Sequence, residues 1–363
     1  MIVTGLKNYI YASNYGEITV SDISDPVAVV LLVEGNTVLE EKYYPDAEGK
    51  AVIHNIGDIL LPYFIQPSDA ALDDSRRKLF LDVTVKIGTS FTHTQTVFYS
   101  NIKNDIDIDF AFAKFLTRYQ KKKTSASRTE FLSFYDNGQS IYVGIAYLYQ
   151  GEPQFFRYKW MDCGSTHEGI SLNMSIQKMK ECVCSNTAHV ITESDIVYYE
   201  AYSVVGENIV SEIRYVNDKR YFPQEKHIFY YNCFGLPETI TFKGADKRSV
   251  EPNATYATMQ NEYRKIDTLP VIYDEVNTGY IDAVESDCIE ELLISDNVYL
   301  YTVSGIDKKI VFTEVDMEKR KPDHAPVSYT LTYRPAALKC LEYKSIVYNA
   351  GRLFDKTFDY TFE

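Results

Sequence analysis

The chain has 363 residues, of which 45% are hydrophobic and 24% are charged, and this balance excludes a disordered polypeptide. Its formal net charge of −14 argues against nucleic acid as a partner, because an acidic surface repels phosphate backbones. The longest apolar run, Val27–Val33, is far shorter than the ~20 residues of a membrane helix, so we expect no membrane insertion.

The N-terminus lacks a basic segment followed by an apolar core, so we expect no signal peptide and a protein that is cytoplasmic when synthesised. The length predicts two or three domains. The 31 tyrosines favour strands, and they also suit recognition surfaces, because each ring carries a hydroxyl group. We therefore predict a mainly β protein of tandem antiparallel β-sandwich domains with a few short helices.

Residues 1–117 are predicted to form the first β-sandwich. The apolar run Val27–Val33 reads as a strand, and Lys78 to Tyr99 as a hairpin that turns at Gly88-Thr89. Between them, Ile59, Leu60 and Phe64 follow helical spacing, and Pro62 must bend or end that helix.

Residues 104–112 alternate acidic and apolar side chains, which predicts a strand. Asp105, Asp107 and Asp109 would then share one face. Three carboxylates on one face suit calcium, but a row of exposed charges also prevents pairing between sheet edges. We favour the second interpretation, because no glycine-hinged acidic loop accompanies the aspartates.

Residues 118–128 are polar and basic without apolar periodicity, so we predict a linker or long loop. A nucleic-acid or lipid patch is the alternative. The cluster is short, has one interleaved aromatic residue and lies in an acidic chain, which favours the linker.

Residues 129–245 are predicted to form a central β domain. Turns at Asp136-Asn137-Gly138 and Gly206-Glu207-Asn208 each predict a hairpin. The segment 170–184 is compatible with a helix or a strand. At residues 226–243, two strands flank the corner NCFGLP, where Gly235 can adopt positive φ, and the second strand alternates as if half-buried.

Residues 243–257 are polar and rich in turn-forming residues, which suggests a second domain boundary. We predict a C-terminal β-rich domain at residues 258–363. It contains a short helix near residues 287–294, capped by Ser286-Asp287.

The six cysteines are scattered, so we expect reduced thiols and no disulfide framework. Four residues resemble a zinc ligand set: Cys163, Cys182, Cys184 and His189. However, Cys-x-Cys is not the spacing of a zinc knuckle, and on a strand both thiols would face one core. We predict no metal site, and the sequence leaves open whether these four side chains approach one another.

The chain has no nucleophile elbow, zinc-protease helix, phosphate loop or dinucleotide fingerprint. We expect no enzymatic activity, no catalytic residue and no cofactor. A hydrolase on a β scaffold is a remaining alternative, because two facing carboxylates suffice for glycoside hydrolysis.

Three segments carry a resemblance: the corner NCFGLPETITF, the stretch EELLISDNVYLYTVSGIDKKIVFTEVD and the closing SYTLTYRPA. Together with VLEEKYYPDAEGKAVIHNIGDILLPYF, they resemble tail-associated structural proteins of phages and prophages of the Bacteroides group. The resemblance implies a subunit similar to distal tail or baseplate proteins, which are built from β-sandwich modules and assemble without enzymatic activity. Its partners would be copies of itself or other tail proteins, and its final location would be the virion.

The alternative is a carbohydrate-binding or adhesive β-sandwich module. Exposed aromatic rings stack on sugars, and the candidate residues are Trp160, Tyr142, Tyr147 and Tyr149. A glycan is therefore a second possible partner.

Overall fold

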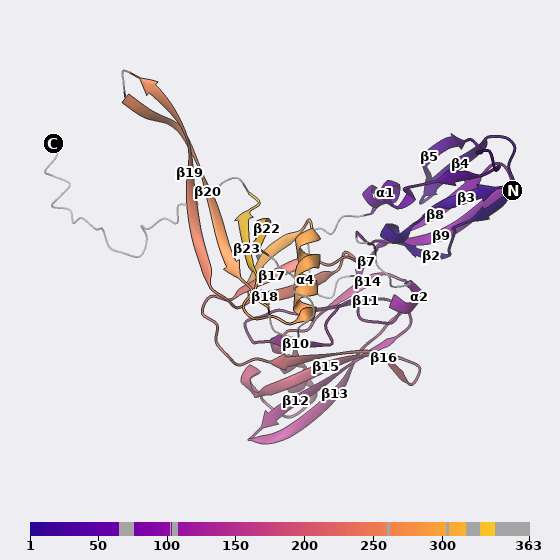
Figure 1. Cartoon of the computed structure of the whole chain (residues 1–363). Helices are drawn as coiled ribbons and strands as arrows, with labels where there is room; N and C mark the ends of the chain where they lie inside the picture. The colour runs from indigo at the N-terminus through magenta and orange to yellow at the C-terminus, as the bar shows by residue number, and fades with distance from the viewer. Residues whose placement is uncertain are drawn as a thin grey trace, which may run out of the picture.

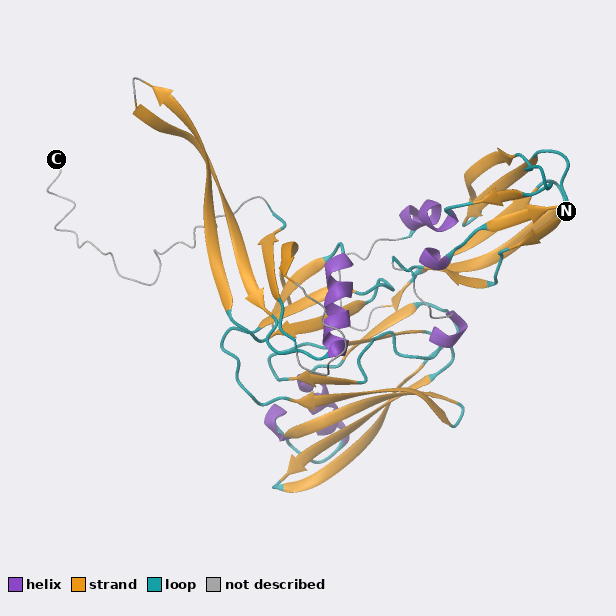
Figure 2. Cartoon of the chain, in the orientation of Figure 1, coloured by secondary structure: helices purple, strands orange, loops and turns teal. Residues whose placement is uncertain are grey.

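The structure, a computed structural model, describes residues 1–64, 76–101, 103, 108–259, 262–302, 305–316 and 327–337. Strands dominate these residues (Figures 1 and 2), most neighbouring strands are antiparallel, and the helices are short. The predicted mainly β fold of sandwich domains is confirmed. Within the described ranges, no helix has the length and apolar character needed to cross a membrane.

Two sheets face each other in the N-terminal domain and enclose their own core. The smaller sheet has the order β1-β3-β6, and the larger has the order β2-β9-β8-β4-β5. Ile18 and Val20 of the small sheet share one apolar cluster with Leu31 and Val85 of the large sheet. The bounds are β1 Ile2–Thr4, β2 Tyr9–Tyr11, β3 Ile18–Ser21, β4 Val27–Val33, β5 Asn36–Tyr43, β6 Ala51–Ile53, β8 Phe80–Ile87 and β9 Phe91–Phe98.

The short helix and the hairpin predicted for this domain are both present. Helix α1 spans Ile56–Leu60 and passes into the 3-10 turn η2 at Leu61–Tyr63, which contains the predicted breaker Pro62. Strands β8 and β9 pair around Gly88 as predicted. A further 3-10 turn, η1 at Ala12–Asn14, packs against α1.

The predicted strand at residues 104–112 is wrong where the structure describes it. Helix α2 occupies Ile108–Ala111 and buries Ile108 and Ala111. A helix satisfies the backbone locally, and the burial of these two apolar residues outweighs the alternating pattern. Asp105 and Asp107 lie outside the described residues, so the calcium alternative stays untested.

A five-stranded sheet with the order β10-β16-β15-β12-β13 forms the lower part of the body (Figure 1). Helix α3, at Ile176–Asn186, and the 3-10 turn η3, at Glu193–Asp195, accompany it. The hairpin predicted around Gly206 is confirmed by β15 and β16. The strands are β10 Lys121–Thr124, β12 Ser140–Tyr149, β13 Glu152–Asp162, β15 Ile196–Val205 and β16 Asn208–Asn217.

The hairpin predicted at Asp136-Asn137-Gly138 is wrong. The turn connects β11 (Phe131–Tyr135) to β12, but β11 belongs to a separate sheet with the order β11-β14-β7, with β14 at Gly169–Asn173 and β7 at Arg76–Arg77. The buried Asp136 carboxylate pairs with the Arg76 guanidinium at 2.5 Å and accepts a hydrogen bond from Thr166. The turn therefore carries the chain from one sheet to another.

The segment 170–184, which the sequence left ambiguous, contains both kinds of element. Strand β14 ends at Asn173, and α3 begins after Ser175, whose hydroxyl accepts a hydrogen bond from the Lys178 amide. Cys182 and Cys184 consequently lie on a helix. Because residues two apart on a helix point to different sides, the predicted common strand face does not exist.

A seven-stranded sheet with the order β18-β17-β21-β22-β23-β20-β19 completes the body. The predicted pair at residues 226–243 is confirmed as β17 and β18, with Gly235 at φ 72° in the corner. However, β18 is buried on both faces, because β11 packs against it. The strands are β17 Lys226–Tyr231, β18 Pro237–Phe242, β19 Asp246–Met259, β20 Glu262–Asn277, β21 Val298–Thr302, β22 Gly305–Asp316 and β23 Thr330–Pro335.

The polar segment 243–257 is mostly strand, not a domain boundary. Strands β19 and β20 pair from Asp246 opposite Val276 to Met259 opposite Glu262. Strand β23 joins β20 only at Asp274–Asn277, so the remainder projects beyond the body (Figure 1). We call residues 246–273, as far as described, the arm. A polar sequence can form these two strands because the hydrogen bonds between them satisfy the backbone.

The predicted C-terminal helix is present but begins earlier. Helix α4 spans Ala283–Ile294, and Asp282 caps it: the Asp282 carboxylate accepts a hydrogen bond from the Glu285 amide, and Glu285 returns one to Asp282. This capping box replaces the predicted Ser286-Asp287 cap.

The predicted linker at residues 118–128 contains a strand that is buried on one face. Strand β10 pairs in parallel with β16, Lys122 is buried beside Glu130 and Glu238, and the Arg128 side chain is fully buried against Glu225. Ion pairing within the body explains why basic residues are found there.

The central and C-terminal segments share one apolar core, which runs from Phe115 to Tyr333. A third cluster joins the N-terminal domain to this body, with Phe98 and Tyr135 ring centroids 5.2 Å apart. Strand pairing and core packing thus connect regions that the predicted boundaries at 129–245 and 258–363 separate. Residues 338–363 of the predicted last domain lie outside the described residues.

Candidate functional site

The structure does not bring the four predicted stacking residues together on one face. Tyr147 is buried, and its hydroxyl group lies 2.8 Å from His189 Nδ1. The Tyr149 ring stacks on His189 with a centroid distance of 3.9 Å, and Trp160 packs half-buried against the main core. Only Tyr142 lies on the opposite side of the sheet, as the alternation of β12 requires.

The opposite side of this sheet, which we call the outer face, combines aromatic and charged side chains. Cross-strand pairing places Lys159, Tyr142 and Tyr202 in one row. The next row contains Arg157, Gly144, Glu200 and Arg214, and Phe155 follows in the third row. The aromatic and charged residues of the outer face are Lys121, Lys123, Tyr142, Phe155, Arg157, Lys159, Asp162, Tyr198, Glu200, Tyr202, Glu212 and Arg214.

Cations cover the tyrosine rings of the outer face. The Arg157 guanidinium lies 5.0 Å from the Tyr142 ring centroid and 5.6 Å from that of Tyr202. The Arg214 guanidinium lies 4.9 Å from the Tyr198 ring and pairs with Glu200. These contacts hold the arginine side chains along the sheet surface.

Phe155 is the exposed ring of the outer face, with 56% of its surface accessible. Its ring lies over Gly144, where an added Cβ would come within 2.6 Å of Phe155 Cζ. This contact was not among the predictions from the sequence. The only signal was a glycine inside an otherwise apolar strand, which often marks close approach of another group.

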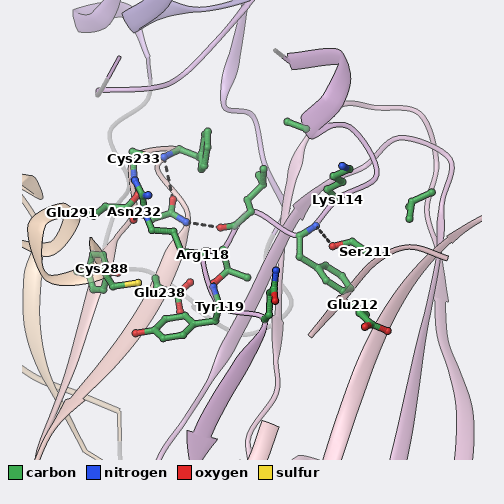
Figure 3. Close-up of a pocket in the computed structure, with 18 of the residues that line it drawn as sticks. Lys114, Arg118, Tyr119, Ser211, Glu212, Asn232, Cys233, Glu238, Cys288 and Glu291 are labelled. Carbon is green, nitrogen blue, oxygen red and sulfur yellow. Dashed lines mark hydrogen bonds and ion pairs between the residues drawn. The ribbon is translucent and has the colours of Figure 1, made fainter. Parts of the chain in front are cut away.

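A second candidate site is a cavity of about 820 Å³ between the segment 114–120, the start of β16, the corner after β17 and α4. Figure 3 shows Glu238, Tyr119 and Cys288 at one side of this cavity and Lys114, Ser211 and Glu212 at the other. A cavity of this size accommodates a small molecule or the side chains of a partner.

The corner residue Asn232 organises one wall of the cavity. Its side-chain amide donates to the Leu116 carbonyl at 3.0 Å, and its side-chain oxygen accepts from the amides of Phe234 and Leu236 at 3.1 Å each. Glu291 of α4 accepts from the Cys233 amide at 2.7 Å and pairs with Arg118. The sequence predicted a turn and a helix for these two segments, but it contained no signal that they border one cavity.

The hydroxyl group of Tyr230 borders the cavity and has no hydrogen-bond partner among the described residues, and the residue is fully buried. Burial raises the pKa of this hydroxyl well above its usual range, so it is a hydrogen-bond donor at neutral pH. An unpaired buried hydroxyl is costly, which makes Tyr230 the group that a bound acceptor or water would satisfy.

The cavity thiols are protonated at neutral pH. Burial raises the pKa of Cys288 to about 12 and that of Cys233 well above its usual range. Burial also raises the pKa of the Glu238 carboxyl, although Lys122 lies 2.9 Å away. The cavity therefore presents neutral thiols and hydroxyl donors, and neither thiol is a thiolate nucleophile.

The suspected metal ligands do not form a cluster. The ring of His189 is engaged by Tyr147 and Tyr149, and the two helical cysteines point to different sides of α3. Across the described residues, no group of three or more histidine, cysteine, aspartate or glutamate side chains is arranged to hold a metal ion. The five cysteines in these ranges are free, and Cys340 lies outside them.

Comparison with known proteins identifies no family for this chain. A scan against protein-family models gives no match, and a search of curated proteins finds no similar sequence. The arm, the outer face and the cavity are thus the features from which a function is inferred.

Proposed function

We propose that the chain is a non-enzymatic structural subunit of a phage tail or tail-like particle. It assembles with further copies of itself or with other tail proteins. The arm is the observation that carries this proposal, because it extends the seven-stranded sheet far beyond the core that stabilises the rest of the chain.

The strands of the arm pair mainly with each other. Strand β19 ends the seven-stranded sheet, so one of its edges has no neighbouring strand among the described residues. Strand β20 has a second neighbour only at Asp274–Asn277. A two-stranded ribbon alone in water is marginally stable, and unpaired strand edges are templates for pairing with another chain.

Docking onto a neighbouring subunit removes both weaknesses of the arm. Added strands or a sheet surface would satisfy the free edges and make the two-stranded ribbon part of a larger sheet. Proteins built into rings or tubes share such contacts between successive copies. The Asp274–Arg248 ion pair, with Nε and Oδ1 2.8 Å apart, stabilises the base of the arm.

A shortened arm tests this function. In the variant, residues 249–273 are replaced by Asn-Gly, so that Arg248 and Asp274, which pair directly, close a two-residue turn. We expect the full chain to form oligomers with rising concentration in sedimentation velocity. The shortened chain should stay monomeric with an unchanged thermal midpoint.

A full chain that remains monomeric at all concentrations, and also fails to bind neighbouring tail proteins produced with it, would contradict the proposal. Equal oligomerisation of the shortened chain would show that the arm is not the contact. Tail genes beside the coding sequence are a further expectation.

A second candidate function is carbohydrate binding by the outer face. The exposed Phe155 ring, supported from below by Gly144, is the specific observation that favours it. Sugars stack on such rings through their apolar faces. A glycan array probed with the full chain and with Phe155→Ala tests this function, and binding that Phe155→Ala leaves unchanged would exclude this face.

A further inference from the structure

We propose that the outer face binds an acidic polysaccharide, with its carboxylates held by the row of cations beside the Phe155 ring. This inference rests on the second candidate function and specifies the class of glycan. It follows from the charge of the face, from the arrangement of its arginines and from a hollow at its edge.

The outer face is basic on a strongly acidic chain. It carries five cations against three carboxylates, namely Asp162, Glu200 and Glu212, whereas the formal net charge of the chain is −14. Glu200 is buried and already paired with Arg214, and Asp162 is paired with Lys159. A local excess of cations attracts anionic ligands and repels cationic ones.

Three of the five cations are available to a ligand. In the ranges that the structure describes, Lys121, Lys123 and Arg157 form no ion pair with a carboxylate. Lys121 and Lys123 point outward because the alternating Lys122 is buried. Arg157 is exposed and lies along the Tyr142 and Tyr202 rings.

An exposed ring and a guanidinium lie side by side on β13. Phe155 and Arg157 are two residues apart on one face of the strand, so their Cα atoms are about 7 Å apart. The tyrosine rings hold Arg157 in place, which reduces the conformational entropy that it loses on binding. A sugar ring stacked on Phe155 would thus bring an attached carboxylate to a preorganised cation that can donate two hydrogen bonds.

The face also offers a hollow at its β10 side. A depression of about 320 Å³ is lined by Gln120, Lys121, Glu200, Glu212, Ile213 and Arg214. The five strands separate this hollow from Phe155 by about 15–19 Å, which is the span of several sugar units and not of one. An extended polymer is therefore a better match than a monosaccharide.

Nucleic acid fits the face less well. Single strands stack successive bases on several open rings, but the tyrosine rings here are covered by arginines and Phe155 is the exposed ring.

Polygalacturonate and its fully methyl-esterified form provide a matched pair of probes, because they share a backbone and differ in the carboxylate charge. Binding of each to the full chain is measured by calorimetry at low salt. We expect polygalacturonate to bind at least tenfold more tightly. Arg157→Gln should weaken that binding about tenfold through loss of a charge-assisted hydrogen bond. Lys50→Gln, which removes one exposed cation from the N-terminal domain, should leave it unchanged.

The possible outcomes distinguish glycan binding by the outer face from its preference for an acidic glycan. Equal binding of both polymers, reduced by Phe155→Ala, overturns the acidic preference but keeps glycan binding. Absence of binding to either polymer and to a glycan array overturns both. Tighter binding of an oligothymidylate, or self-association that Arg157→Gln abolishes, would assign the face to nucleic acid or to a second copy and overturn the proposal.

Discussion

The Nζ atom of Lys122 lies 2.7 Å from the Oε2 atom of Glu130, and both side chains are buried. Glu238 approaches the same ammonium group at 2.9 Å, and the Thr239 carbonyl accepts a further hydrogen bond from it. Burial alone lowers the pKa of Lys122, but the two carboxylates outweigh burial and raise it. The ammonium group therefore stays charged and ties β10 to β18.

Lys122→Ala should unfold far more easily than the unmodified chain. Removal of the ammonium leaves Glu130 and Glu238 buried without a countercharge, which costs about 3–5 kcal/mol. Lys123→Ala is the matched control, because Lys123 is the next residue along β10 and its side chain is exposed. Urea unfolding at neutral pH measures the stability of both variants. Equal midpoints would show that Glu130 and Glu238 do not depend on the Lys122 ammonium group for compensation of their charge.

The Asp218–Arg220 pair should contribute to stability in a defined pH range. Hydrogen bonding from Arg220 is the main cause that lowers the pKa of Asp218 to about 2. The unfolded chain titrates near pH 3.8, so the stabilisation is fully present above that pH and is lost as pH falls through about 2.

Arg220→Ala should therefore lower the unfolding free energy slightly at pH 6, since Arg220 is largely exposed and solvent screens the pair. The difference from the unmodified chain should shrink between pH 4 and pH 2. Denaturant unfolding at several pH values measures this difference in unfolding free energy. A difference that stays constant from pH 4 to pH 2 would show that the Asp218–Arg220 pair is not its cause.

Gly57→Ala should destabilise the N-terminal domain. A Cβ at Gly57 would lie 2.0 Å from the Ala12 carbonyl oxygen, and two backbone segments cannot separate as an exposed side chain can. Overpacking of this kind costs about 1–3 kcal/mol. Gly16→Ala is the control, because no atom lies within 4 Å of its added Cβ. Thermal unfolding should separate the two variants, and equal midpoints would mean that η1 moves away freely.

Tyr230→Phe should raise the unfolding free energy by about 1 kcal/mol, because it removes a buried hydroxyl that has no partner in the part of the chain that the structure describes. Asn232→Ala should have the opposite effect, since its side chain makes three hydrogen bonds to the backbone. Urea unfolding compares the two. A clear loss of stability in Tyr230→Phe would indicate that a bound water or ligand occupies the cavity and uses the hydroxyl.

The sequence by itself determined the local elements of this protein. The apolar run Val27–Val33, the turns at Gly88 and Gly206 and the corner at Gly235 all predicted structure that is present, because strand preference and backbone φ depend on neighbouring residues. The mainly β fold followed from the same signals. Polar composition was less informative, since the residues of β10 were predicted to be a linker or long loop and residues 243–257, which contain most of β19, a domain boundary.

Only the tertiary structure decided which strands pair and which side chains meet. The turn at Asp136-Asn137-Gly138 predicted a hairpin, yet β11 pairs with the distant β14, and Asp136 forms an ion pair with the distant Arg76. Likewise, Phe155 meets Gly144, and Asn232 and Glu291 border one cavity, through contacts between residues far apart in the chain or on different strands. Such contacts depend on the whole packing free energy, which no local pattern encodes.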